Sequence, residues 1–315
     1  MDSIQRVFYD FLDHFGASYT KRILVEAVQL LGQLWPYLVG GIVLSTLVKL
    51  FISKERMTAY FSRGSAGATI LSASLIGVVA PLGSYVIIPL SAALLGIGVP
   101  LPVLMALIVS SPLMNPNLFV LTAGAMGLEM ALLRTFSAFL LGTAAGYSTL
   151  WMMKRKMVDP DRVIRNNRQF ALERFSGGDA GRTVKDFFRE LYRMTVYISK
   201  YFFLAIILAA VIKIAVNPKI IVKLFDSDNL LSVILSTAAG VPFYVCGGAA
   251  IPVVQQLADL GMSQGSVLAF FISGPVTKIS NLVIIQAAFR GIILVQYLAI
   301  GIFGAIVLGL IYNLF

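Results

Sequence analysis

The sequence predicts an all-α polytopic membrane protein with about 8–10 transmembrane helices, in two homologous, inverted repeats with broken helices at the membrane midplane. Three observations lead to this prediction: an apolar composition, basic residues gathered in one linker, and motifs that recur in both halves. They divide the chain into an N-terminal segment (1–24), a first membrane repeat (25–153), a linker (154–195) and a second membrane repeat (196–315).

The composition is typical of a membrane protein. Of the 315 residues, 58% are hydrophobic and 13% are charged, and the mean hydropathy is +0.87. Soluble domains carry roughly 25% charged residues and about 45–50% apolar residues. Because one crossing needs about 20 mostly apolar residues, the length accommodates roughly eight to ten spans. The lipid bilayer is therefore an expected partner.

Residues 1–24 predict an amphipathic helix that lies along the membrane surface. The segment lacks the continuous apolar core of a signal peptide. Its apolar residues recur at helical spacing, while acidic and basic residues occupy the other face. The apolar residues are Ile4, Val7, Phe8, Phe11, Leu12 and Phe15.

The linker (154–195) carries much of the charge. The net charge is +10, and twelve of the 25 Lys and Arg residues lie between Lys154 and Lys200. Loops rich in Lys and Arg face the cytoplasm, so we expect the linker to be cytoplasmic. Because this charge lies beside membrane spans, nucleic acid is not an expected partner. We interpret the linker as a connector between the halves, with a regulatory role as the alternative.

The two halves match at a constant offset of 163 residues. Counting every broken segment as a crossing gives about five spans per half, an odd number that inverts the second half and places both termini opposite the linker. Counting these segments as re-entrant pairs gives about eight spans in total. The residues that coincide are Pro89, Gly98, Ser110 and Pro112 with Pro252, Gly261, Ser273 and Pro275, respectively.

Four segments rich in proline and glycine interrupt apolar stretches: 81–84, 110–112, 242–248 and 273–275. Non-helical backbone persists at membrane depth only where it is buried in protein or lines a cavity. The four segments therefore predict a polar substrate pathway, with packing kinks as the alternative. The candidate pathway residues are Gly83, Ser84, Tyr85, Ser110, Ser111, Pro112 and Asn115 in the first half, and Tyr244, Cys246, Gly247, Ser273, Gly274, Pro275, Thr277, Lys278 and Asn281 in the second.

Lys278 is the candidate with the clearest chemistry. It follows Pro275 by three residues, as Asn115 follows Pro112. An ionisable side chain within a membrane segment indicates a functional site. Such a lysine would exchange a proton or anchor an anionic group; a lysine that extends to the membrane surface is the alternative. Arg134 and Arg290 are expected to mark membrane boundaries.

The motifs "GVPFYVCGGAAIP", "LGMSQGSVLAFFISGPVTKISNLVI", "PLGSYVIIPL" and "SSPLMNP" resemble the bacterial predicted-permease family that includes the organoarsenical efflux permease ArsP. The resemblance covers residues 25–152 and 196–313. It implies a protein of the bacterial inner membrane that exports trivalent organoarsenicals such as methylarsenite. Cys246 is then a candidate arsenic ligand, because trivalent arsenic prefers soft thiolate ligands. A thiol that only fills space is the alternative.

Other functional classes lack their signatures. The chain has one cysteine and one histidine, which excludes a metal site built from several of either within one chain. It contains no HExxH, GxSxG or Walker A motif. We therefore expect neither an enzyme nor a cofactor, and we expect an ion gradient as the energy source. A channel or a transporter for another small solute or anion is the alternative function. The oligomeric state stays open, a homo-oligomer included.

Overall fold

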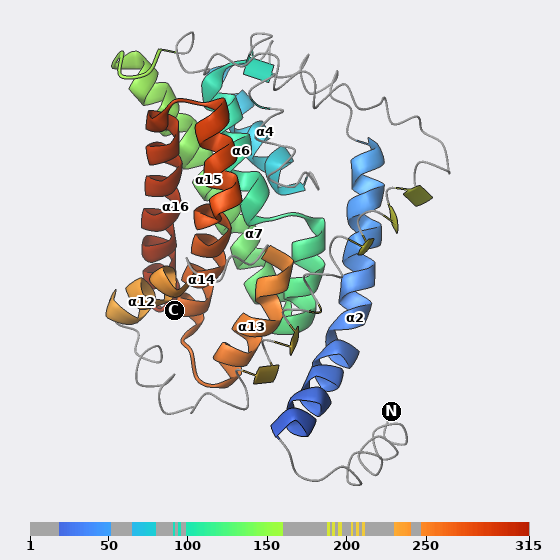
Figure 1. Ribbon diagram of the computed structural model, residues 1–315. Coiled ribbons are helices and arrows are strands. Elements are labelled where there is room, and N and C mark those ends of the chain that lie inside the picture. Colours follow the sequence, from blue (N-terminus) through green and yellow to red (C-terminus); the bar gives the residue numbers. More distant parts are fainter. Residues whose placement is uncertain are drawn as a thin grey trace.

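The protein is built from α-helices (Figure 1). The computed structural model describes residues 19–51, 65–79, 99–159, 230–240 and 247–314, with isolated residues between 91 and 95 and between 188 and 211. In chain order the helices of these stretches are α2 (Tyr19–Phe51), α4 (Ala66–Val79), α6 (Leu101–Leu113), α7 (Pro116–Lys154), α12 (Leu230–Gly240), α13 (Gly247–Asp259), α14 (Gln264–Thr277), α15 (Ile279–Ala288) and α16 (Gly291–Tyr312).

Length and composition make this a multi-pass membrane protein. Three stretches are long and apolar enough to cross a membrane: Ile23–Gly40, Leu101–Lys154 and Gly291–Tyr312. Helices α4 and α12 are shorter and apolar as well. Large apolar side chains also cover the outside, where Phe303 is 70% exposed and Val295 is 66% exposed. In water such a surface would aggregate, whereas in lipid it is the expected exterior.

Helix α7 consists of two arms, 116–126 and 128–154, joined at Gly127. Gly127 has φ 89° and ψ 165°, a conformation that side chains with a Cβ rarely adopt. Arg134 in the second arm bonds to Thr122 in the first arm, although twelve residues of continuous helix would separate them by about 18 Å. The chain therefore reverses direction at Gly127.

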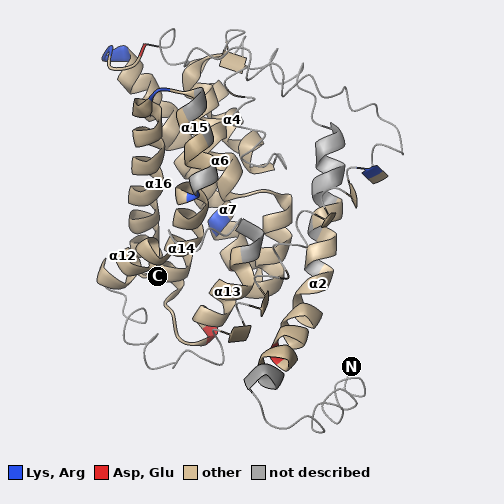
Figure 2. Cartoon of the chain, viewed as in Figure 1, with Lys and Arg blue, Asp and Glu red and all other residues tan. Residues whose placement is uncertain are grey.

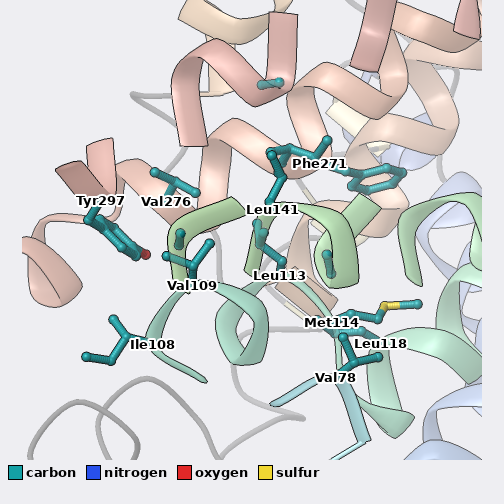
Figure 3. Close-up of a cluster of buried hydrophobic side chains, with 14 of the residues drawn as sticks. Val78, Ile108, Val109, Leu113, Met114, Leu118, Leu141, Phe271, Val276 and Tyr297 are labelled. Carbon is teal, nitrogen blue, oxygen red and sulfur yellow. The ribbon is translucent and has the colours of Figure 1, made fainter. Parts of the chain in front are cut away.

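Helices α6 and α14 form the centre of the fold. Every residue of α6 is buried, and so is every residue of α14 after Gln264, which is why their sequences are mostly apolar on all sides. Helices α4 and α7 pack around α6, and α12 and α16 pack around α14. Figure 3 shows where the groups meet: Leu141 of α7 lies between Leu113 of α6 and Phe271 of α14.

The two groups of helices have equivalent boundaries at the offset of 163 residues. Helices α6 and α14 begin at Leu101 and Gln264, and the first arm of α7 and α15 begin at Pro116 and Ile279. The second arm of α7 begins one residue after Gly127, and α16 begins one residue after the equivalent Arg290. Helix α12 begins one residue later than the offset from α4 requires.

Close helix contacts obey the same offset. A Cβ at Gly146 of α7 would overlap Ile70 and the carbonyl oxygen of Pro102. A Cβ at Gly309 of α16 would meet the equivalent atoms, those of Val233 and the carbonyl oxygen of Gly265. Each group of helices is thus held together by the same three-helix contact, in which glycine lets two backbones approach.

The second arm of α7 and α16 pack side by side in opposite directions. Near the start of the arm, Glu129 accepts a hydrogen bond from the hydroxyl of Tyr312, at the end of α16 (3.0 Å). Near its end, Ser148 accepts one from Gln296, close to the start of α16 (2.7 Å). Midway, Leu141 fills the space beside Gly304. These equivalent helices are therefore antiparallel.

Candidate functional site

The first of two described helix breaks lies between α6 and α7. Pro112 lies in the last turn of α6, which ends at Leu113. Met114 is extended (φ −146°, ψ 146°), and Asn115 then caps α7 by accepting a hydrogen bond from the backbone N–H of Leu118 (3.0 Å). Because proline weakens the preceding turn and asparagine followed by proline favours a helix start, the sequence specifies both the stop and the restart.

The second break lies between α14 and α15 and consists of Lys278 alone. Lys278 is half-buried and has φ −57° and ψ 117°, so it ends one helix and begins the next. The buried Asn281 donates a hydrogen bond across the break to the carbonyl oxygen of Pro275 (2.9 Å). The hydroxyl of Thr277 donates to the carbonyl oxygen of Ser273 (2.8 Å). Side chains thus satisfy carbonyl groups that the interrupted helix leaves open.

The serines that precede the two breaks lie in helix contacts. Ser110 donates to the carbonyl oxygen of Ala106 (2.8 Å), and Ser273 donates to that of Phe270 (3.3 Å). A Cβ at Gly77 would overlap the Ser110 hydroxyl, and one at Gly240 would overlap that of Ser273. The neighbouring residues are buried as well: Ser111, Pro112, Gly274 and Pro275.

The structure describes part of the predicted pathway, and the roles of these residues stay predictions. The residues at the two breaks are described, and their central helices α6 and α14 are in contact. Gly247 begins α13, which packs against α7 and α14. The remaining candidates lie outside the described residues, so their roles stay predictions: Gly83, Ser84, Tyr85, Tyr244 and Cys246.

Arg134, which is expected at a membrane boundary, lies in the interior of the protein, and its depth in the membrane stays a prediction. The side chain is only 2% exposed. Its Nη1 donates a hydrogen bond to the hydroxyl of Thr122 (2.6 Å), and its guanidinium carbon lies 3.9 Å from the centroid of the Phe271 ring. Nη2 is buried and has no hydrogen-bond partner in the described part of the chain. The reversal at Gly127 explains the difference, because it folds the arginine back against the first arm of α7.

One signal in the sequence could have identified Arg134. It lies in the apolar run "MALLRTFSAFLL", much as Lys278 lies between apolar stretches. A basic residue within such a run is a functional candidate by the same argument that singled out Lys278. Figure 2 shows basic segments in the middle of the helical body as well as at its ends.

The position equivalent to Arg134 holds Tyr297, at the same offset of 163 residues. Tyr297 is fully buried, and its hydroxyl lies beside Asn281 without a hydrogen bond of good geometry. In Figure 3 its ring lies between Val276 and Ile108. Both halves therefore bury a long polar side chain here, but only the first half carries a charge.

Acidic groups are sparse around these positions. Within the described stretches no three or more His, Cys, Asp or Glu side chains form a group that could hold a metal ion. What the arrangement offers chemically is hydrogen bonding and positive charge, from the two interrupted helices, Lys278 and Arg134.

Comparison with known proteins agrees with this architecture. The profile of the ArsP_1 family, described as a predicted permease, matches residues 23–314. The UPF0718 protein YcgR of Bacillus subtilis (strain 168) is 24% identical over 272 residues, which are 85% of this chain and 86% of that protein. No solved structure matches the chain. The family match covers nearly the whole chain, and the protein therefore belongs to this family of predicted permeases.

Proposed function

We propose that this permease is a secondary transporter of the bacterial inner membrane that exports trivalent organoarsenicals such as methylarsenite, driven by the proton gradient. Membership of the predicted permease family makes it a transporter in class. The observation that carries the finer proposal is the pair of helix breaks at Met114–Asn115 and Lys278, which occupy equivalent positions in the two halves.

The two halves are proposed to be inverted repeats. Equivalent helix starts and equivalent glycine contacts support a duplication, because unrelated helices would not share one offset over so many positions. The antiparallel packing of the second α7 arm against its equivalent α16 supports inversion. A two-fold axis that relates antiparallel helices lies perpendicular to them, hence in the membrane plane.

This symmetry supports an alternating-access mechanism. In inverted-repeat transporters, one group of helices rocks against the other and exposes a central site to each side in turn. Interrupted helices near the centre supply backbone N–H and C=O groups without a large rearrangement. Lys278 would couple this motion to a proton, because it is the ionisable residue that joins α14 to α15.

The cytoplasmic location of the linker (154–195) is part of the same proposal. It is supported by the cluster of basic residues, of which Lys154, Arg155 and Lys156 are described and exposed at the end of α7. With an odd number of crossings per half, both termini would then lie outside the cytoplasm. Labelling of a cysteine placed near residue 314, in a Cys246→Ser background, only from the cytoplasmic side would contradict this topology.

The organoarsenical cargo is supported by the family resemblance and by the thiol of Cys246. The test is uptake of methylarsenite into everted membrane vesicles with an imposed proton gradient. We expect accumulation that a protonophore abolishes, and weaker accumulation in Cys246→Ser, because a serine hydroxyl is a poor ligand for soft arsenic. Parental rates in the serine variant would make the thiol a packing residue. No accumulation by the parent would reject the cargo.

A further inference from the structure

Arg134 is a positive charge without a carboxylate partner among the described residues. Its interactions are one hydrogen bond to the Thr122 hydroxyl and the stack on Phe271. Thr122 is itself fully buried and already donates its hydroxyl to the carbonyl oxygen of Leu118 (2.7 Å). The threonine therefore only accepts from the arginine, and it cannot neutralise the charge. A buried cation in this state is strongly unfavourable unless an anion joins it.

One nitrogen of the guanidinium group, Nη2, has no hydrogen-bond partner among the described residues. The Phe271 ring covers one face of its plane, and Thr122 takes a hydrogen of Nη1. The N–H groups of Nη2 have no acceptor among the described residues, although almost no solvent reaches the side chain. Two adjacent nitrogens of a guanidinium match two oxygens of a carboxylate or oxyanion, and stacking on a ring fixes the plane of that fork.

The fold itself does not require a charge at this position. In the equivalent position of the second half, Tyr297 fills the space as a neutral side chain. A long polar residue is thus compatible with the shared packing without any positive charge. The arginine consequently adds a chemical property to one half rather than a packing element common to both.

We propose that Arg134 binds an anionic oxygen of a small solute, a carboxylate or an oxyanion, at its Nη2, and that this solute is cargo of the permease. The inference rests on the proposed transport function and adds an anionic cargo to the organoarsenical, because methylarsenite is uncharged near neutral pH and is not itself the anion. Thr122 and Phe271 orient the guanidinium, and Nη2 supplies the contact. Arg155 lies over Trp151 in a similar way (5.4 Å) but is exposed, so no anion is needed to stabilise its charge.

The test is thermal unfolding of the purified full chain in lipid nanodiscs with four sodium salts: formate, acetate, phosphate and methylarsonate. Each salt is titrated at constant ionic strength, with acetamide as the neutral probe. We expect at least one anion to raise the Tm of the parent saturably, by about 3 °C or more at large excess over its Kd. The shift should vanish in Arg134→Gln, shrink in Arg134→Lys, which keeps the charge without the fork, and persist in Arg155→Gln.

The outcomes are separable. If no salt shifts the parent, or if parent and Arg134→Gln shift equally, the arginine is a structural residue and the inference falls. Arg134→Tyr, which reproduces the residue of the second half, serves as the neutral variant if Arg134→Gln elutes as aggregate. Anion binding is measured without a gradient, so it can fail while methylarsenite export persists. Export can fail in turn while anion binding persists, which would reject the arsenical cargo alone.

Discussion

The two halves of the permease share their packing and differ in their chemistry. Gly146 and Gly309 hold the same three-helix contact in each half. At the helix breaks, however, Asn115 of the first half is replaced by Lys278 in the second. Within the second arm of α7 and α16, Arg134 is replaced by Tyr297. Each half therefore contributes one basic residue, at a different place. The comparison indicates that the helix packing shared by the two halves sets where polar side chains lie, while the residue type at each position determines what such a side chain would bind.

The largest effect is expected at Lys278, the residue that most distinguishes the two breaks. Lys278→Met and Lys278→Arg should both lose gradient-driven export in everted vesicles and still bind substrate, because arginine keeps the charge but does not release its proton. Arg155→Gln, at an exposed basic position after the end of α7, is the control and should retain export. Gradient-dependent transport by Lys278→Arg would exclude proton coupling at this residue, and transport by Lys278→Met would exclude any role.

A second prediction tests the shared packing. Gly146→Val and Gly309→Val should each destabilise the protein by about 1–3 kcal/mol or prevent folding, because the new side chain overlaps a neighbouring helix. Gly32→Ala is the matched control, since a Cβ there has no atom within 4 Å. Thermal unfolding and the yield of monodisperse protein measure the effect. If valine were tolerated in one half alone, the two glycine contacts would not be equivalent.

A smaller effect is expected at the cap of the first break. Asn115→Ala removes the side-chain acceptor for the Leu118 N–H and should cost about 1 kcal/mol of stability. Asn115→Ser should recover most of that loss, because serine is also a good cap. Equal Tm values for the parent and the alanine variant would show that the backbone, and not this side chain, defines the start of α7.

The smallest effect is expected where the halves meet near the surface. Tyr312→Phe removes the hydrogen bond to Glu129 and should cost about 0.5–1 kcal/mol. The coupling is isolated by a double-mutant cycle with Glu129→Gln, read from unfolding midpoints. A coupling near zero would indicate that Leu141 and Gly304, rather than this bond, hold the second arm of α7 against α16.

Much of the fold class followed from the sequence, because composition and proline chemistry are local properties. An apolar chain with interrupted helices was expected, and α6 and α14 do end within three residues of Pro112 and Pro275. The sequence placed the interruptions at the prolines themselves. The helices instead continue past them. A proline lacks the N–H that bonds to the preceding turn, but its own carbonyl oxygen can still accept a hydrogen bond. The carbonyl oxygen of Pro275 accepts one from the side chain of Asn281.

Arg134 could not be placed from local pattern alone. An arginine among apolar residues fits a membrane boundary as well as an interior site. Only the reversal at Gly127 decides between them, because it brings Thr122 and Phe271 around the guanidinium. A single glycine in a long apolar run carries little information about chain direction. The contact between Arg134 and Thr122, on either side of Gly127, therefore depends on tertiary structure.

The contact between Leu141 and Gly304 has a consequence for motion between the two halves. These two residues are themselves equivalent, 163 positions apart, so each half meets its own counterpart there. If the halves exchange conformations during transport, a contact between non-equivalent residues passes to their counterparts, whereas this pair is exchanged with itself. The contact would therefore be present in both conformations. The Leu141 side chain would turn against Gly304 without losing contact. The motion of the permease would then be a rotation of the second arm of α7 and α16 about this contact.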